Sequence, residues 1–326
     1  MRDFGYARAA DADAAVTLLA DRPDARLIAG GTDLLGLLKE DIEHPGLLVD
    51  ISRTALTGVS AGPDGLVLGA LTRLSDAAAH PLVRAAFPAL ATALEKSASP
   101  QLRNLATLGG NVLQRTRCPY FRAETDLPCN KRTPGSGCAA LTGHQRAAGL
   151  FGTSDACVAT HPSDLAVALA ALDATVLVRG ARGERVLGIE ALYAPTDSPP
   201  HVEHRLEHAE MITAIRVPAT PLAALSRYLK VRERASYEFA LVSAAVAVTV
   251  EGGTVSDVRI ALGGVAPRPW RLRGAEQALR GGPLTPESVS DALASELDGA
   301  RTLPGNAFKV PLVRRTVVRA LTGESP

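Results

Sequence analysis

The four cysteines of this chain gather in one polar, turn-rich region. Cys118, Cys129 and Cys138 lie within the stretch CPYFRAETDLPCNKRTPGSGC, and Cys157 follows soon after it. Free cysteine usually packs as a small apolar residue, but three of these four stand among Arg, Lys, Asn, Pro and Gly. The grouping therefore indicates a shared chemical task for the thiols rather than four unrelated buried positions.

Three chemistries use four thiols. Disulfides are disfavoured because a chain of 326 residues can bury a large core without them. Structural zinc usually takes its thiolates from two short C-x2–4-C pairs, and the sequence has none. A [4Fe–4S] cluster needs one thiolate at each of four corners, and these can come from spread positions on a wrapping loop. The spacing by itself leaves the cluster and zinc both open.

Basic residues accompany the cysteines and could offset the negative charge of a thiolate-ligated cluster. Considered singly, each of these basic residues is also explained as part of a solvent-exposed loop surface. Prolines and glycines in the same stretch suit a loop that folds tightly around an object. The basic residues are Arg115, Arg117, Arg122, Lys131 and Arg132.

Two glycine pairs could present backbone amides to phosphate. In RLIAGGTDLLGLLKE, residues 26–40, a strand ends at Gly30-Gly31 and a helix is predicted to begin near Thr32. Amides at a helix N-terminus bind anions. An ordinary strand-to-helix turn with Thr32 as N-cap would also account for this sequence. A second predicted glycine turn lies in ATLGGNVLQ, residues 106–114. Together the two turns suggest opposite walls of a nucleotide cleft.

The elements that would position these residues fall into three segments. Residues 1–54 read as β-α-β-α-β, which favours a small sheet with helices packed on it. Residues 55–217 read as a hairpin at Pro63-Asp64-Gly65, several helices, the cysteine region at about 115–160, and then a further helix and strands. We therefore expect the cysteine region to be an insertion within the second segment.

The third segment spans residues 220–326. Residues 226–264 read as strands and a helix rich in Ala and Val, and three helices follow. The fold class predicted for the whole chain is α+β. No Rossmann fingerprint follows a predicted strand, so a dinucleotide would have to bind through a different fold.

Charge and hydropathy exclude several classes of partner. The net charge is +1, and there is no basic stripe interleaved with aromatic residues, so nucleic acid is not an expected partner. No apolar run is long enough to span a bilayer. The N-terminus has aspartates where a signal peptide has its apolar region. The sequence itself therefore predicts a cytoplasmic protein, unless a partner with a twin-arginine signal exports it already folded.

These motifs together resemble the FAD-binding medium subunit of molybdenum hydroxylases, the xanthine oxidase family. The resemblance is greatest to the aldehyde oxidoreductase branch, whose flavin subunit also holds a [4Fe–4S] cluster, and it extends along nearly the whole chain. The stretches that carry it are AGGTDLL, LRNLATLGGNVLQRTRCPYF, PCNKRTPGSGCAAL, ATHPSDLAVALAALDA and YLKVRERASYEFALVSAAVAV.

The resemblance implies a fold and a set of binding residues. The fold would be the FAD-binding type of the vanillyl-alcohol oxidase class, with two subdomains around the flavin and an α+β flavoprotein domain at the C-terminus. Cys118, Cys129, Cys138 and Cys157 would ligate the cluster. The residues implied to bind FAD are Arg26, Leu27, Ile28, Ala29, Gly30, Gly31, Thr32, Asp33 and Leu34, with Thr107, Gly110, Asn111, Asp164 and Lys230.

Two of these residues also have simple structural explanations. Ser163 and Asp164 precede an apolar helix, where capping is the commonest role for such residues. Lys230 and Arg232 alternate along a predicted strand, which is typical of a solvated face. Their functional assignment therefore depends on the co-occurrence of all the motifs.

The resemblance also implies partners and a division of labour. A large subunit would hold the molybdenum cofactor, and a small subunit would hold [2Fe–2S] clusters, giving a heterotrimer that converts an aldehyde to a carboxylic acid. This chain would contribute no catalytic residue and would pass electrons to an acceptor such as ferredoxin. The alternatives are a zinc-stabilised interaction module without redox activity, the flavin subunit of an enzyme like 4-hydroxybenzoyl-CoA reductase, and a self-sufficient flavin oxidase.

Overall fold

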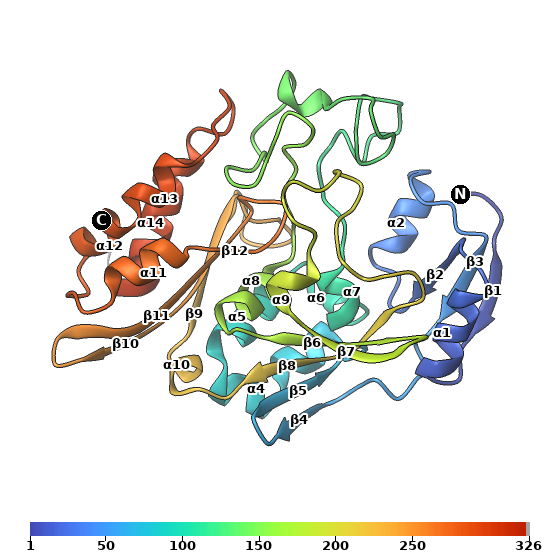
Figure 1. Cartoon of the computed structure of the whole chain (residues 1–326), viewed down its shortest axis with the longest axis horizontal. Coiled ribbons are helices and arrows are strands. Elements are labelled where there is room, and N and C mark those ends of the chain that lie inside the picture. Colours follow the sequence, from blue (N-terminus) through green and yellow to red (C-terminus); the bar gives the residue numbers. More distant parts are fainter. Residues whose placement is uncertain (324–326) are drawn as a thin grey trace.

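The computed structural model describes residues 1–323. Its first sheet is the small sheet with packed helices that the sequence predicts, and its strands are parallel. The strand order is β1-β3-β2, and the two helices make the connections (Figure 1). The Asp11 carboxylate caps the first helix by accepting a hydrogen bond from the Ala14 amide at 2.8 Å. The elements are β1 (Gly5–Arg8), α1 (Ala12–Ala20), β2 (Ala25–Ile28), α2 (Leu34–Lys39) and β3 (Leu47–Asp50).

The second sheet is antiparallel, with strand order β4-β5-β8-β6-β7. Its first two strands form the hairpin predicted at Pro63-Asp64-Gly65, and Gly62 pairs with Gly65 across the turn. Strand β7 was not anticipated from the sequence. The strands are β4 (Val59–Gly62), β5 (Gly65–Gly69), β6 (Thr175–Gly180), β7 (Gly183–Gly188) and β8 (Met211–Pro218).

Short helices cover this sheet and join it to its neighbours. The helical stretch after residue 80 is divided into two helices, because Pro88 starts a new one after Phe87. The helices are α3 (Leu74–Ala79), α4 (Pro81–Ala86), α5 (Pro88–Lys96), α6 (Pro100–Arg103), α7 (Leu108–Val112), α8 (Asp164–Ala171), α9 (Ile189–Leu192) and α10 (Pro221–Ala224).

Between α7 and α8 the chain forms the irregular cysteine region. Its regular structure is one 3-10 turn, η1 (Ala139–Leu141), and isolated bridges such as Cys129 with Cys138. In Figure 1 this region is the green set of loops that stands beyond the sheets, between α2 and the C-terminal helices. The region therefore depends on its neighbours, rather than on its own hydrogen-bond ladders, for its shape.

The third sheet is antiparallel, with order β12-β11-β10-β9, and is backed by the C-terminal helices. The prediction of a helix within residues 226–264 is wrong, because that segment forms three strands. Helices α8 and α14 both pack on β10, so its Ala and Val side chains are buried on both faces without alternation. The elements are β9 (Arg227–Val231), β10 (Val242–Glu251), β11 (Thr254–Gly263), β12 (Trp270–Arg271), α11 (Arg273–Leu279), α12 (Pro286–Ala292), α13 (Ala294–Asp298) and α14 (Lys309–Thr322).

Helix α8 joins the second and third sheets. All of its residues are buried, and it packs against α5 and α7 on one side and against β10 and β11 on the other.

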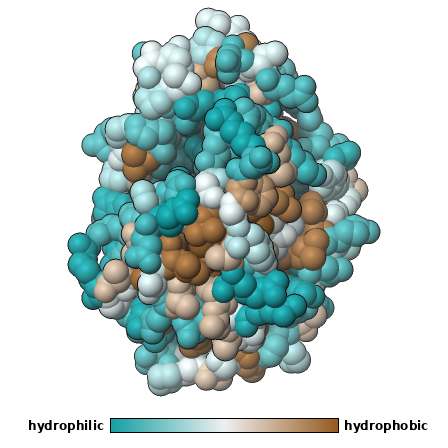
Figure 2. Space-filling view, turned by 90° about the vertical axis from the view of Figure 1, so that its right-hand side faces the viewer, coloured by the Kyte–Doolittle hydropathy of each residue, from teal (hydrophilic) through white to brown (hydrophobic). Residues whose placement is uncertain are grey.

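On the side of the molecule that carries the first sheet, apolar residues gather in the middle of the surface and polar residues surround them (Figure 2). No helix within residues 1–323 combines the length and apolar character needed to cross a membrane.

Replacing Leu169 of α8 with alanine is expected to destabilise the chain by about 2–5 kcal/mol, because a fully buried leucine leaves a cavity that the tight core cannot refill. Urea unfolding followed by circular dichroism measures this. Val186→Ala on β7, where the side chain is 56% exposed, is the control and should change stability by no more than about 0.5 kcal/mol. Equal losses for the two variants would contradict a central role for α8.

Candidate functional site

A cavity of about 520 Å³ lies between the first and second sheets, and both predicted glycine segments line it. Every residue from Arg26 to Leu34 borders this cavity. From the second segment, Thr107, Gly109, Gly110 and Asn111 border it too. The structure thus brings the two segments to one space, although they are far apart in the sequence.

The first glycine segment rests directly on the chain just before the second. A β-carbon added to Gly30 would lie 1.9 Å from the carbonyl oxygen of Leu105, so only glycine fits there. Gly31 has φ +70°, a backbone conformation that favours glycine. The glycines are therefore needed for close packing and for the turn at this wall of the cavity.

Helix α2 begins at Leu34, later than the start predicted near Thr32, and Asp33 occupies the N-cap position without making a side-chain cap. The Asp33 carboxylate is used elsewhere: it accepts hydrogen bonds from the Arg115 amide and the Arg122 guanidinium, both at 2.8 Å. It also pairs with Arg117 at 2.8 Å. Asp33 therefore ties the first glycine segment to the cysteine region.

The second glycine segment is a helix rather than the predicted turn. Its amides are partly committed, since Leu108 donates to the Thr72 carbonyl at 3.0 Å and Gly109 donates to the Ala70 carbonyl at 2.8 Å. A β-carbon on Gly109 would lie 3.1 Å from that of Ala70, so α7 packs closely against the second sheet. Fewer amides of this wall are available to an anion than the sequence suggested.

The basic residues of the cysteine region are paired with carboxylates rather than spread over a solvated face. Arg115 bridges Glu43 at 2.6 Å and Glu203 at 2.5 Å, and Lys131 reaches the same Glu203 at 2.9 Å. Burial alone would raise the pKa of Glu203, but Lys131 and Arg115 outweigh it and hold that pKa below its usual value. Arg132 donates to the Ala123 carbonyl at 2.6 Å and has only a long ion pair, 4.0 Å, with the exposed Asp126.

The four cysteines are free thiols that converge in this region. Cys129 and Cys138 face each other across a backbone bridge, and Cys118 packs into the same apolar clusters as both. Burial raises the pKa of Cys157 to about 11, with smaller contributions from Cys138 and Cys118. Within residues 1–323 no three His, Cys, Asp or Glu side chains meet closely enough to hold one metal ion.

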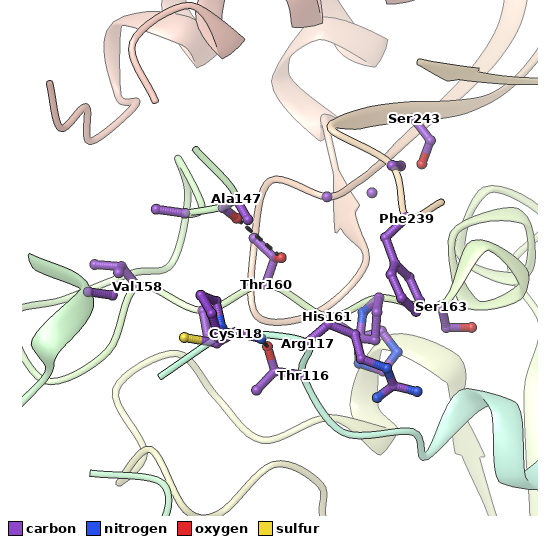
Figure 3. A pocket seen from close by; sticks show the side chains of 18 of the residues that line it. Thr116, Arg117, Cys118, Ala147, Val158, Thr160, His161, Ser163, Phe239 and Ser243 are labelled. Carbon is purple, nitrogen blue, oxygen red and sulfur yellow. Dashed lines mark hydrogen bonds between the residues drawn. The ribbon is translucent and has the colours of Figure 1, made fainter. Parts of the chain in front are cut away.

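A second, smaller cavity of about 70 Å³ lies beside the cysteine region. Figure 3 shows that its walls include the chain around Cys118, the segment around Ala147, the segment from Val158 to Ser163, and the loop and strand carrying Phe239 and Ser243. The Ser163 hydroxyl donates to the Asn111 side-chain oxygen at 2.6 Å, so the walls of the two cavities are hydrogen-bonded to each other.

Asp164 and Lys230 form a buried ion pair beside this smaller cavity. Asp164 borders the cavity, and Lys230 lies behind it, with its amino group 2.8 Å from the Asp164 carboxylate. Tyr228 donates to the other carboxylate oxygen at 2.5 Å. Burial raises the pKa of Asp164, although Lys230 opposes this. The solvated-face interpretation of Lys230 is therefore wrong, and the cap of α8 is Ser163, which accepts from the Ala166 amide at 3.0 Å.

Comparison with known families agrees with this geometry. Residues 2–220 match the family model described as the FAD binding domain in molybdopterin dehydrogenase, and residues 227–324 match the CO dehydrogenase flavoprotein C-terminal domain. The chain belongs to this family of FAD-binding subunits. The predicted family and α+β fold class are confirmed, and the chain is a flavoprotein subunit of an oxidoreductase.

Individual members of the family show the extent of the similarity. The chain is 45% identical to the aldehyde oxidoreductase FAD-binding subunit PaoB of Escherichia coli K12, over 98% of each chain. It is 30% identical to the carbon monoxide dehydrogenase medium chain of Hydrogenophaga pseudoflava, over 91% of this chain and 88% of that one. A solved carbon monoxide dehydrogenase from the same organism superposes with a TM-score of 0.76 at 29% identity, over 98% and 96% of the two chains.

The flavoprotein subunit has the space and the chemistry that FAD requires. FAD is long, with a ring at one end and a nucleoside at the other. Here a large cavity and a smaller one share Arg117 as a wall residue, and their walls are hydrogen-bonded through Asn111 and Ser163. The walls of the large cavity include glycines that bring backbone close to a ligand, as well as a helix start. The residues present therefore fit the cofactor.

Gly30→Ala should reduce the FAD content of the purified subunit at least several-fold, because the new methyl group would push the glycine segment away from Leu105. Flavin absorbance after acid release measures the stoichiometry. Gly188→Ala is the matched control, since no atom lies within 4 Å of its added β-carbon. FAD retention equal to the wild type would show that this wall does not position the cofactor.

The stability of the flavoprotein should also depend on pH through His161. Burial lowers the pKa of His161 to about 4, from about 6.5 when unfolded. Between these values the unfolded chain binds a proton that the folded chain does not, so stability falls as pH drops from about 6.5 towards 4. The effect is at most about 3 kcal/mol.

His161→Asn should flatten this part of the curve of unfolding free energy against pH. His201→Asn, at an exposed position, should leave the curve unchanged. Urea titrations between pH 4 and 8 provide the measurement. Identical curves for the wild type and His161→Asn would mean that this histidine titrates normally in the folded chain.

Proposed function

We propose that this chain is the FAD- and [4Fe–4S]-binding electron-transfer subunit of a molybdenum-dependent aldehyde oxidoreductase. The observation that carries the proposal is the shared wall between the two candidate cofactor sites. One loop, at about residues 115–160, carries all four thiols, Cys118, Cys129, Cys138 and Cys157. The same loop supplies the arginines that bind Asp33 of the first glycine segment.

The FAD would lie along the two cavities. The segment Arg26–Leu34 would hold the diphosphate, and Thr107, Gly110 and Asn111 would form the facing wall. Asp164 would lie next to the flavin ring, with Lys230 fixing its position and charge from behind. The three sheets support dividing the chain into residues 1–54, 55–217 and 220–326, the first two enclosing the cofactor.

The four cysteines would ligate the cluster. They are free, they come from one loop, and burial raises the pKa of Cys118 and Cys157, so a bound metal would be needed to stabilise them as thiolates. A tetrahedral zinc site requires sulfur atoms about 2.3 Å from one ion, whereas a cube holds its four thiolates farther apart. The ion pairs of Arg115, Arg122 and Lys131 would keep the loop folded around the cluster.

When bound, FAD accepts electrons in pairs and the cluster carries them singly. The chain's own residues position these groups and exclude water from them.

A partner large subunit with a molybdenum cofactor would oxidise the aldehyde, with water supplying the oxygen of the carboxylic acid. A small [2Fe–2S] subunit would complete a heterotrimer, and a one-electron acceptor such as ferredoxin would take the electrons. The complex could be cytoplasmic or exported together with a signal-bearing partner.

Cofactor analysis of the complex purified without oxygen tests this assignment. We expect one FAD and four iron and four sulfide ions for this chain beyond those of the partners, with no zinc. Cys129→Ser should lose the iron assigned to this chain while keeping FAD. Asp126→Asn, an exposed residue of the same loop, should lose neither. Stoichiometric zinc in place of iron would favour the interaction-module alternative.

The ferredoxin route has its own test. Cys129→Ser should still allow an aldehyde to bleach the flavin absorbance in a stopped-flow experiment, but reduction of added ferredoxin should slow at least tenfold. Undiminished ferredoxin reduction in a variant shown to lack the cluster would remove the cluster from the electron path.

A further inference from the structure

Arg117 occupies a position that no other residue of the described chain shares. Among residues 1–323 it is the one residue that borders both the large cavity and the smaller cavity. It also directly precedes Cys118. Figure 3 shows its side chain leaving the cysteine region and ending beside His161 and below the Phe239 ring. Its guanidinium therefore stands at the junction of the two cavities.

Contacts on several sides fix the guanidinium in this place. It pairs with the Asp33 carboxylate at 2.8 Å and donates to the carbonyl of Arg115 and to the Gln114 side chain. Its Cζ atom lies over the Phe239 ring, 5.2 Å from the ring centre, which is a cation–π distance. With so many partners the charge cannot move far, so it acts on the cavities from a fixed point.

The Arg117 guanidinium has a shared carboxylate as its one ion-pair partner among the described contacts. Asp33 is shared between Arg117 and Arg122, and Arg122 has Glu40 as a second partner, while Arg117 has no other carboxylate within the described contacts. The ion pairs fall into two groups. Arg117 and Arg122 pair with Asp33 and Glu40, two cations with two carboxylates, whereas the second group contains Arg26, Arg115 and Lys131 with Glu43 and Glu203. Arg117 is the member whose charge faces both cavities.

We propose that Arg117 is a positioning residue that sets the reduction potential of the flavin from the cysteine loop. This inference rests on the proposed placement of FAD along the two cavities. A fixed guanidinium at the junction would favour the anionic reduced flavin over the neutral oxidised form and so raise the potential. Because Arg117 adjoins Cys118, the same residue would keep the flavin and the cysteine cluster in a fixed relation.

Spectroelectrochemical titration of the FAD-loaded complex tests the inference. Arg117→Gln should move the flavin midpoint potential to more negative values, while the cluster's visible and paramagnetic signals keep their wild-type form. Arg146→Gln is the matched control: it removes an equal charge from the same loop region, but Arg146 pairs with Glu233, outside the Asp33 group, and borders neither cavity. It should leave the flavin potential within error of the wild type.

Arg117→Lys separates the charge from the shape of the side chain. It keeps the positive charge but loses the planar fork, so the potential should stay near the wild-type value while FAD dissociates about tenfold faster. This variant also serves if Arg117→Gln fails to fold.

The outcomes distinguish this inference from the proposed function. Arg117→Gln with full FAD content and an unchanged potential would overturn the role of Arg117 and leave the FAD assignment intact. Equal shifts in Arg117→Gln and Arg146→Gln would also overturn it, because the effect would then come from the net charge of the loop rather than from the position of Arg117. Wild-type protein that never binds FAD would instead refute the proposed placement of the cofactor.

Discussion

The site depends on one carboxylate, that of Asp33. It lies at the start of α2 and accepts the Arg115 amide while pairing with Arg117 and Arg122. These partners belong to a region with hardly any regular secondary structure, so little in its own backbone fixes its shape. Charge-assisted hydrogen bonds in a partly buried setting are stronger than neutral ones and are directional. The Asp33 contacts therefore determine where the cysteine region lies against the first sheet.

A second buried charge pair plays the corresponding part on the other side of the smaller cavity. Lys230 on β9 reaches Asp164 at the start of α8, and Tyr228 and Ser97 add hydrogen bonds to the same carboxylate. Removing one partner of such a pair leaves an uncompensated buried charge, which costs about 3–5 kcal/mol. The pair thus fixes the third sheet against α8, and both cavities are bounded by elements held through ion pairs.

The sequence predicted the elements well where local patterns decide them. The β-α-β-α-β order, the hairpin at Pro63-Asp64-Gly65 and helix α8 all follow from periodicity and turn residues. It failed at β10, because an Ala- and Val-rich run has no alternation when both faces are buried, and only the packing of α8 and α14 makes it a strand. It also failed at α7, where contacts with the second sheet stabilise a helix containing two glycines.

The candidate residues were foreseeable as types but not as partners. The glycine pairs and the group of cysteines can be recognised in the sequence, because each is local. The pairing of Asp33 with Arg122 cannot, because it joins positions far apart in the chain. No local rule links them, and a surface arginine and a structural one look alike in sequence. The Asp33–arginine contacts also couple the two candidate sites thermodynamically. A group that binds only the folded cysteine loop stabilises that fold, and with it the arrangement of arginines that holds Asp33. Because linkage is reciprocal, a ligand that orders the glycine segment must favour the folded loop to the same extent.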